Sequence, residues 1–186
     1  MTKIIAAINM TLDGFCDHTA LLPDKEIHQH YTELLGDGDV ILYGRITFQL
    51  MEFWRTVLEN PSEEQSMNDF AFAIDKIPKI VFSNTLKEVD WDSARLSDQS
   101  LEEVVSEFKQ SRNGGSKHIF AGSRSLILQL MNLNLIDEYQ ICIHPVLAGN
   151  GLPLFEHSNK RTMLKLIKTK TFSGGAVILY FEPDSA

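Results

Sequence analysis

The chain has 186 residues, of which 44% are hydrophobic and 23% are charged, and its formal net charge is −8. This length suits one domain, residues 1–186, and the hydrophobic fraction supports a core that needs no disulfide or metal as a staple. The acidic balance argues against nucleic acid and against an anionic membrane surface as partners. It leaves phosphate-bearing small molecules open, because a pocket can differ in sign from the whole surface.

The cysteines suggest the compartment, and the histidines argue against a metal site. Cys16 and Cys142 form no C-x-x-C pair, which is typical of free thiols in a reducing compartment. His28 and His30 lie two apart, not at the i, i+4 spacing of a helical zinc pair. The N-terminal residues lack the apolar segment of a signal peptide, and no stretch approaches the roughly 20 apolar residues of a membrane span. We therefore expect a cytoplasmic protein without a metal.

The first two-thirds of the chain alternate apolar runs with helical patterns. The expected elements are a strand at 3–9, a loop at 11–22, a helix from Pro23 to Gly36, a strand at 40–43 and a helix from 45 to about 54. The next expected elements are a polar surface segment at 55–69, a short helix at 68–76, a strand at 78–83, a helix opened by Ser100 and Glu103, a strand at 117–121 and a helix at 123–133. Gly114 and Gly115 are expected to lead into the 117–121 strand.

The pattern changes after residue 138. Tyr139, Ile141 and Ile143 alternate with polar or small residues, which indicates a strand with two different faces. Strands at 162–169 and 175–182 are joined around a Gly-Gly pair, a hairpin signal. The sequence thus predicts a three-layer α-β-α fold, with a mostly parallel central sheet that ends in antiparallel C-terminal strands.

Residues 40–47, Val-Ile-Leu-Tyr-Gly-Arg-Ile-Thr, form the most informative segment. A strand runs into a glycine and then a helix, and the first amides of such a helix favour an anion. Arg45 adds a planar charged fork and Thr47 adds a hydroxyl, which together suit a phosphate. The alternative is that Arg45 is a solvated surface residue.

A second strand–glycine–helix junction occupies residues 117–126, where Ser123 is the expected N-cap. Ligands of open α/β sheets bind outside the carboxyl ends of the strands, so both junctions are expected to face one crevice.

These residues resemble the dihydrofolate reductase superfamily, and most closely the reductase domain of the riboflavin-biosynthesis deaminase-reductases. The resemblance covers nearly the whole chain in six motifs in the family's order. The motifs are Ile5-Ala6-Ala7, Thr11-Leu12-Asp13-Gly14, Gly44-Arg45-Ile46-Thr47-Phe48, Ser83-Asn84-Thr85-Leu86, Ala121-Gly122-Ser123-Arg124-Ser125-Leu126, and Leu135 to Glu138 followed by Pro145 to Gly151.

The resemblance implies a dihydrofolate reductase-like fold, NADPH as cofactor, hydride transfer to a small heterocyclic substrate and a homodimer. It places the nicotinamide at the backbone of Ala7 and the adenosine 2′-phosphate near Ser83 and Asn84. The remaining phosphate contacts that it implies are Gly44, Arg45 and Thr47 in the first junction, and Gly122, Ser123, Arg124, Ser125 and Leu126 in the second.

The catalytic acid is less defined by the resemblance. Asp13 is a candidate for substrate contact, and the alternative is a simple Asp-Gly turn. Glu26 is the other candidate, since Asp24 and Glu26 straddle the position of an acid in folate reductases; the alternative is charge that complements the helix dipole. A dihydrofolate or pteridine reductase and a non-catalytic NADPH-binding sensor remain as alternative functions.

Overall fold

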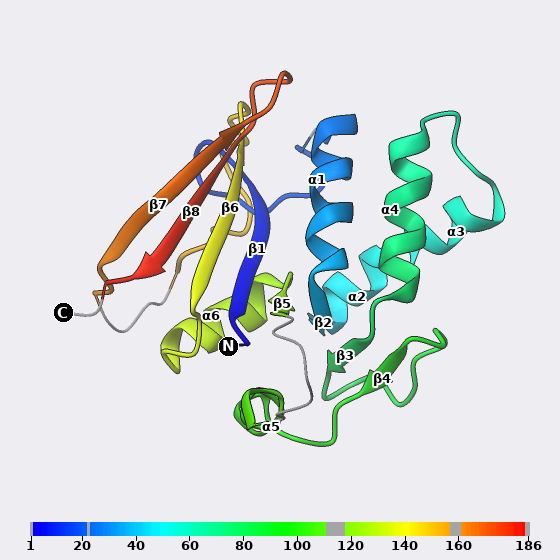
Figure 1. The fold of residues 1–186 in the computed structure, drawn as a ribbon, viewed down its shortest axis with the longest axis vertical. Helices are drawn as coiled ribbons and strands as arrows, with labels where there is room; N and C mark the ends of the chain where they lie inside the picture. The colour runs from blue at the N-terminus through cyan, green and yellow to red at the C-terminus, as the bar shows by residue number, and fades with distance from the viewer. Residues whose placement is uncertain (1, 22, 111–117, 157–160, 185–186) are drawn as a thin grey trace.

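The computed structural model describes residues 2–21, 23–110, 118–156 and 161–184, and its centre is an eight-stranded sheet (Figure 1). The strands are β1 (Ile4–Thr11), β2 (Gly38–Gly44), β3 (Lys79–Phe82), β4 (Ala94–Leu96), β5 (His118–Ala121), β6 (Glu138–His144), β7 (Leu164–Thr171) and β8 (Val177–Pro183). Their order is β4-β3-β2-β5-β1-β6-β8-β7. The pairs from β4 to β6 are parallel, whereas β8 runs antiparallel to both β6 and β7.

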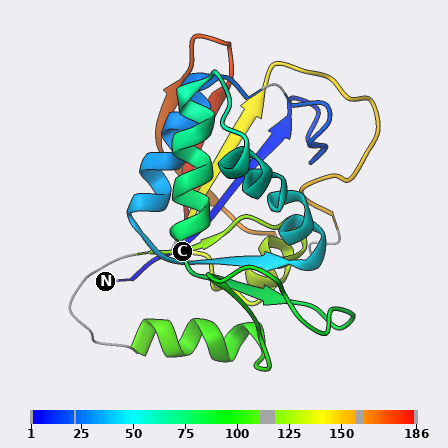
Figure 2. The same ribbon diagram turned by 90° about the vertical axis from the view of Figure 1, so that its right-hand side faces the viewer.

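Helices cover both faces of the sheet (Figures 1 and 2). They are α1 (Lys25–Gly36), α2 (Arg45–Met51), α3 (Phe53–Glu59), α4 (Gln65–Lys76), α5 (Leu101–Gln110) and α6 (Arg124–Asn132). On β2, Val40 and Leu42 belong to the core shared with α5 and α6, while Ile41 and Tyr43 belong to the core shared with α1, α2 and α4. A strand buried on both faces explains why residues 40–43 are continuously apolar.

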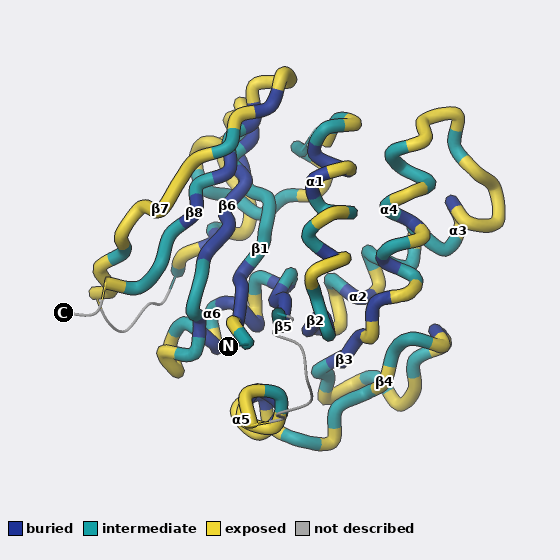
Figure 3. Tube along the Cα trace, viewed as in Figure 1, coloured by how far each residue is buried: buried dark blue, intermediate teal, exposed yellow. Residues whose placement is uncertain are grey.

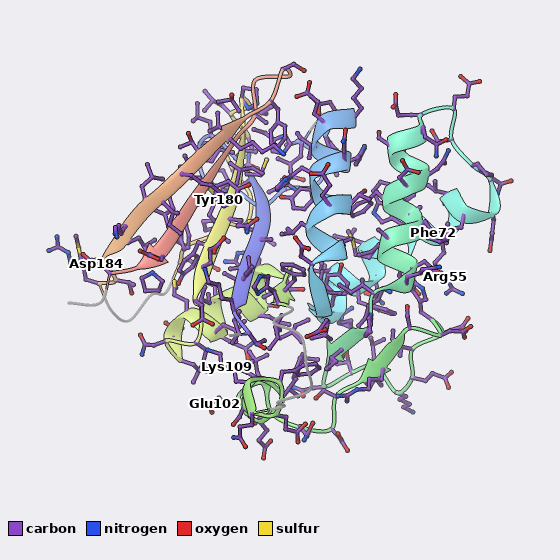
Figure 4. The ribbon with its side chains drawn as sticks, viewed as in Figure 1. Arg55, Phe72, Glu102, Lys109, Tyr180 and Asp184 are labelled. Carbon is purple, nitrogen blue, oxygen red and sulfur yellow. The ribbon has the colours of Figure 1, made fainter. Side chains whose placement is uncertain are left out.

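The antiparallel part of the sheet has its own core. Cys142, Ile178 and Tyr180 pack against Ile27 of α1, and Figure 4 labels Tyr180 on β8. The outermost strand, β7, is exposed along most of its length (Figure 3). One side of α1 thus covers the antiparallel strands β6 and β8.

The predicted fold class is confirmed: three layers, with a mostly parallel sheet and antiparallel C-terminal strands. The capping box is confirmed as well, because Ser100 N–H and Oγ both donate to Glu103 Oε2, at 2.8 and 2.7 Å. The hairpin is confirmed by β7 and β8, and Gly175 at its tip has φ +87°.

Three expectations need correction. The helix after β2 does not stop near residue 54; it breaks at Glu52 and resumes as α3 to Glu59. The polar segment at 55–69 is therefore partly helical, and α4 begins at Gln65, three residues before the expected start. The three-residue strand β4 was not foreseen, because a strand this short has no readable periodicity. Gly114, Gly115 and Lys117, which were expected to lead into and begin β5, lie outside the described residues.

Candidate functional site

The two glycine junctions lie side by side, because β2 and β5 are parallel neighbours. The Gly44 N–H donates to Ser123 Oγ at 2.8 Å, and Ser123 is buried. A Cβ built on Gly44 would lie 2.9 Å from Ser125 Oγ, and one on Gly122 would lie 3.3 Å from Tyr43 Cε1. Both glycines therefore let the junctions and their strands pack closely, a role that sequence reasoning had assigned to the approach of a ligand.

Ser123 occupies the N-cap position of α6, as expected, but its side chain makes no capping hydrogen bond. Its hydroxyl instead holds the backbone of the other junction, so it is a buried link between two turns and is not exposed to a phosphate.

An inner cavity of about 600 Å³ opens between the sheet and helices α1, α2 and α4. Ala7 lines it from β1, and Gly122, Arg124 and Ser125 line it from the second junction. Much of the remaining wall is apolar, contributed by Leu34, Ile41, Tyr43, Leu50, Met51, Phe70, Ile74 and Phe120. An apolar cavity of this size with a few polar groups at one end is typical of a small-molecule site.

An outer cavity of about 590 Å³ lies on the other side of the first junction. Its wall brings together most of the expected phosphate contacts, from three segments of the chain: Gly44, Arg45, Thr47, Ser83, Asn84, Ser125 and Leu126. Ile46, Thr47 and Ser125 line both cavities, so the two adjoin at α2. Ile46 is 62% exposed and forms part of this shared wall.

Arg45 is exposed at the mouth of the outer cavity, where its Nη1 donates to Gln49 Oε1 at 3.2 Å. Arg124 differs: its Nε donates to Pro153 O at 2.6 Å, and its Nη2 pairs with Glu156. Arg124 therefore anchors the 153–156 segment beside the inner cavity, and its charge is already balanced by a carboxylate. Of the two arginines, Arg45 is the one suited to bind a free phosphate.

The structure does not bring Asp13 into either cavity. Its Oδ1 accepts from Thr11 Oγ1 at 2.6 Å and from Ala148 N at 3.1 Å, and its Oδ2 accepts from Gly149 N at 2.7 Å. These bonds, with the Thr11 hydroxyl first, lower the pKa of Asp13. Asp13 joins the loop after β1 to the loop after β6, and a carboxylate held ionised is a poor proton donor.

Glu26 is also placed elsewhere. Its carboxylate accepts from Ser173 Oγ at 2.6 Å and from Ser173 N at 2.9 Å, in the loop between β7 and β8. The Ser173 hydroxyl, followed by the Ser173 amide, lowers the pKa of Glu26. Glu26 fastens the hairpin to α1, and neither candidate acid is placed where it could protonate a ligand in the inner cavity.

Sequence reasoning missed a polar cluster at the inner cavity. Asn9 lines the cavity from β1, and its Oδ1 lies 3.1 Å from both Tyr31 Oη and His144 Nε2. The available signal was that Asn9 follows Ala7 by two residues on β1, so both face the same side of the sheet. A single asparagine in an apolar run carries no motif, which is why it was not singled out.

The histidines and cysteines are dispersed. His28 contacts Trp54 and Phe70, whereas His30 contacts Tyr31 and Phe172, so the two side chains point in different directions. Both cysteines are free thiols. Within the described ranges, no group of three or more His, Cys, Asp or Glu side chains could hold a metal ion. No described helix is both long enough and apolar enough to cross a membrane.

Comparison with known proteins is in keeping with this geometry. The family model described as the RibD C-terminal domain matches residues 2–178. The chain belongs to this family. The uncharacterized protein YyaP of Bacillus subtilis (strain 168) is 35% identical over 186 residues, covering 96% of this chain and 94% of YyaP.

Solved structures support the fold. The putative riboflavin biosynthesis protein of Shewanella sp. PV-4 is 20% identical with a TM-score of 0.71, covering 98% of this chain and 99% of that one. The diaminohydroxyphosphoribosylaminopyrimidine deaminase/5-amino-6-(5-phosphoribosylamino)uracil reductase of Thermotoga maritima is 14% identical with a TM-score of 0.63. That match covers 98% of this chain and 57% of the Thermotoga chain. The RibD family and its dihydrofolate reductase-like fold, expected from the motifs, are thereby confirmed.

Proposed function

We propose that this protein is an NADPH-dependent reductase that delivers a hydride to a small heterocyclic compound of the pyrimidine or pteridine type. The observation that supports it best is the pair of adjoining cavities, of about 600 and 590 Å³, which share a wall at α2. An extended dinucleotide needs one polar compartment for its phosphates and one flatter compartment for its reactive ring. The second compartment must also admit the substrate.

The outer cavity fits the phosphate-bearing part of the cofactor. Arg45 offers a guanidinium with a single exposed partner, Gln49, among the described residues, and Thr47, Ser83 and Ser125 offer hydroxyls. These groups come from separate segments that the sheet and the two junctions hold in place. The expected preference for NADPH over NADH is part of the proposal and rests on this polar wall.

The inner cavity fits the nicotinamide and the substrate ring. When bound, NADPH would supply the hydride, and the chain supplies position and exclusion of water. The apolar walls from α1, α2 and α4 exclude water from the reacting rings. The Thermotoga maritima relative is described as a reductase of an aminouracil compound, which supports a pyrimidine-type ring as the substrate class.

A second candidate is a protein that binds NADPH without turnover. It is favoured by the positions of Asp13 and Glu26, whose carboxylates hold loops together away from the inner cavity. A dihydrofolate reductase proper is less well supported than a reductase of the RibD type, because the RibD model spans nearly the whole chain.

The first experiment is calorimetric titration with NADPH and with NADH, followed by NADPH oxidation assays with pyrimidine and pteridine compounds. Tight binding of NADPH with substrate-dependent oxidation supports the reductase. Binding without oxidation of the cofactor by any compound favours the sensor, and failure to bind either nucleotide contradicts both.

Replacing Arg45 tests the phosphate compartment. Arg45→Ala removes the charge that faces the outer cavity, so we expect the Kd for NADPH to rise about tenfold, equivalent to about 1.4 kcal/mol. Arg55→Ala is the matched control, because Arg55 on α3 (labelled in Figure 4) donates instead to the backbone of Asp90. Equal affinities of the wild type and Arg45→Ala would remove Arg45 from the cofactor site.

A further inference from the structure

Asn9 occupies a distinctive position on the wall of the inner cavity. It lies on the central strand β1, next to Cys142 of β6, two residues beyond Ala7. Its carboxamide oxygen is 3.1 Å from Tyr31 Oη of α1 and 3.1 Å from His144 Nε2 at the end of β6. Three elements of the fold thus converge on one side chain that faces the cavity.

Tyr31 fixes the direction of the first hydrogen bond. Burial raises the pKa of Tyr31 well above its usual range, so the phenol keeps its proton. A buried hydroxyl needs an acceptor, and Asn9 Oδ1 is the partner at hydrogen-bonding distance. The Tyr31 O–H therefore donates to the oxygen of Asn9.

His144 donates to the same oxygen. The imidazole is 1% exposed, and burial lowers its pKa, so it is neutral at pH 7 and carries one N–H. A carboxamide oxygen can only accept, so Nε2 carries the hydrogen and donates to Asn9. Cys142 Sγ lies 3.7 Å from His144 Nε2 and is a second neighbour of this nitrogen.

These two bonds use both lone pairs of Asn9 Oδ1, which fixes how the carboxamide is turned. The two hydrogens on Nδ2 remain. No described residue accepts from Nδ2, and this nitrogen is not among the buried polar atoms without a partner. An oriented amide donor therefore faces an otherwise largely apolar cavity.

We propose that Asn9 selects the substrate ring, by donating from its side-chain amide to an exocyclic carbonyl oxygen of the ring. Tyr31 and His144 are positioning residues that hold the donor in this orientation. The apolar side chains of Leu34, Leu50 and Phe70 supply apolar contacts for the ring itself. This inference deepens the proposed function, since it takes the inner cavity as the substrate site.

A matched pair of ring compounds tests the proposal. Pteridine-2,4-dione carries two exocyclic carbonyl acceptors, and 2,4-diaminopteridine carries amino donors at the same two positions. We expect the wild type, titrated calorimetrically, to bind the dione about tenfold more tightly, because the diamino compound turns a donor toward the donor of Asn9.

Asn9→Asp is the decisive variant. The carboxylate still accepts from Tyr31 and His144, but it presents an acceptor to the cavity in place of an amide. The preference should invert, with the diamino compound bound more tightly than the dione. Inversion cannot arise from misfolding, which would weaken both compounds together.

Tyr31→Phe tests the positioning role. It leaves the amide of Asn9 in place and removes one of its two anchors, so the dione preference should shrink without inverting. A purely structural role for Tyr31 would lower the unfolding temperature and leave the ratio of the two affinities unchanged.

Several outcomes would overturn the assignment of Asn9: no binding of either compound by the wild type, a wild-type preference for the diamino compound, or an unchanged preference in Asn9→Asp. The proposed function is judged separately, by titration of the same proteins with NADPH. A ring preference that inverts in a protein that does not bind NADPH would uphold Asn9 and reject the reductase.

Discussion

Lys79 holds its ammonium group inside the protein at the start of β3. The residue is 1% exposed, and Nζ donates to Ser93 Oγ at 2.7 Å, to Ile77 O at 3.0 Å and to Asp75 O at 3.2 Å. The same nitrogen lies 4.1 Å from the centre of the Trp91 ring. Burial lowers the pKa of Lys79 from 10.5 to about 8, although the negative charge of Asp75 acts to raise it.

This shift predicts a stability that rises with pH. Between pH 8 and 10.5 the unfolded chain keeps a proton that the folded chain has lost, so the free energy of unfolding increases across that window. We expect a gain of about 1–3 kcal/mol from this lysine, allowing for the hydrogen bonds that its charged form retains. Urea unfolding at pH 7.5 and at pH 10 measures it.

Lys79→Met is the control for that prediction, because tyrosines and other groups also titrate in the same window. The variant keeps those groups and removes the lysine, so its free energy of unfolding should rise less with pH than that of the wild type. Parallel curves for the two proteins would show that Lys79 keeps its proton when folded.

At the scale of the elements, the two strand–glycine–helix junctions were visible in the sequence, but the bond between them was not. Residues 40–47 and 118–126 contain the strand, the glycine and the helix start as expected. The link from Gly44 N to Ser123 Oγ joins positions 79 residues apart, and no local pattern encodes such a contact. Because the sequence does not reveal this contact, Ser123 was expected to bind phosphate and not to accept a hydrogen bond from Gly44.

Two serines in the second junction should separate stability from binding. Ser123→Ala leaves the buried Gly44 N–H without an acceptor and should lower the free energy of unfolding by about 1–3 kcal/mol. Ser125 is exposed and lines both cavities, so Ser125→Ala should leave stability within about 0.5 kcal/mol and weaken NADPH binding. Denaturant unfolding and calorimetric titration of both variants measure these effects, and the reverse pattern would contradict the division of roles.

At the scale of the whole molecule, periodicity predicted the layers and most elements, because alternation and apolar runs directly reflect which faces are buried. Function was harder to predict from residue type. Asp13 and Glu26 have the chemistry of catalytic acids, but only the fold shows that backbone amides and hydroxyls of distant loops occupy them. Asn9 is neither an acid nor a base, and only the contacts with Tyr31 and His144 in the fold set the orientation of its side-chain amide.

The exposed outermost strand, β7, leads us to predict a homodimer. β7 pairs with β8 on one side and is exposed along most of its length (Figure 3). On β7, Leu166 is 50% and Ile167 is 45% exposed. We expect a homodimer that buries this strand of both copies, since a twofold interface brings the same patch together from each protomer. Sedimentation velocity should give a dimer for the wild type and a monomer for the double variant Leu166→Glu, Ile167→Glu.

Phe72→Glu serves as the control for the assembly, because Phe72 is also exposed, at 55%, but lies on α4, on the opposite side of the molecule from β7 (Figures 1 and 4). That variant should remain a dimer. A wild type that sediments as a monomer, or dimers that persist in the β7 double variant, would contradict an interface at β7.

The wall shared by the two cavities links their occupants thermodynamically. Ile46, Thr47 and Ser125 belong to both, so a ligand that settles these side chains in one compartment prepares them for the other. Whatever factor the first ligand applies to the affinity of the second, the second must apply to the first. The short helix α2 would then lie between the two ligands, and the binding of either ligand would change the affinity of the protein for the other.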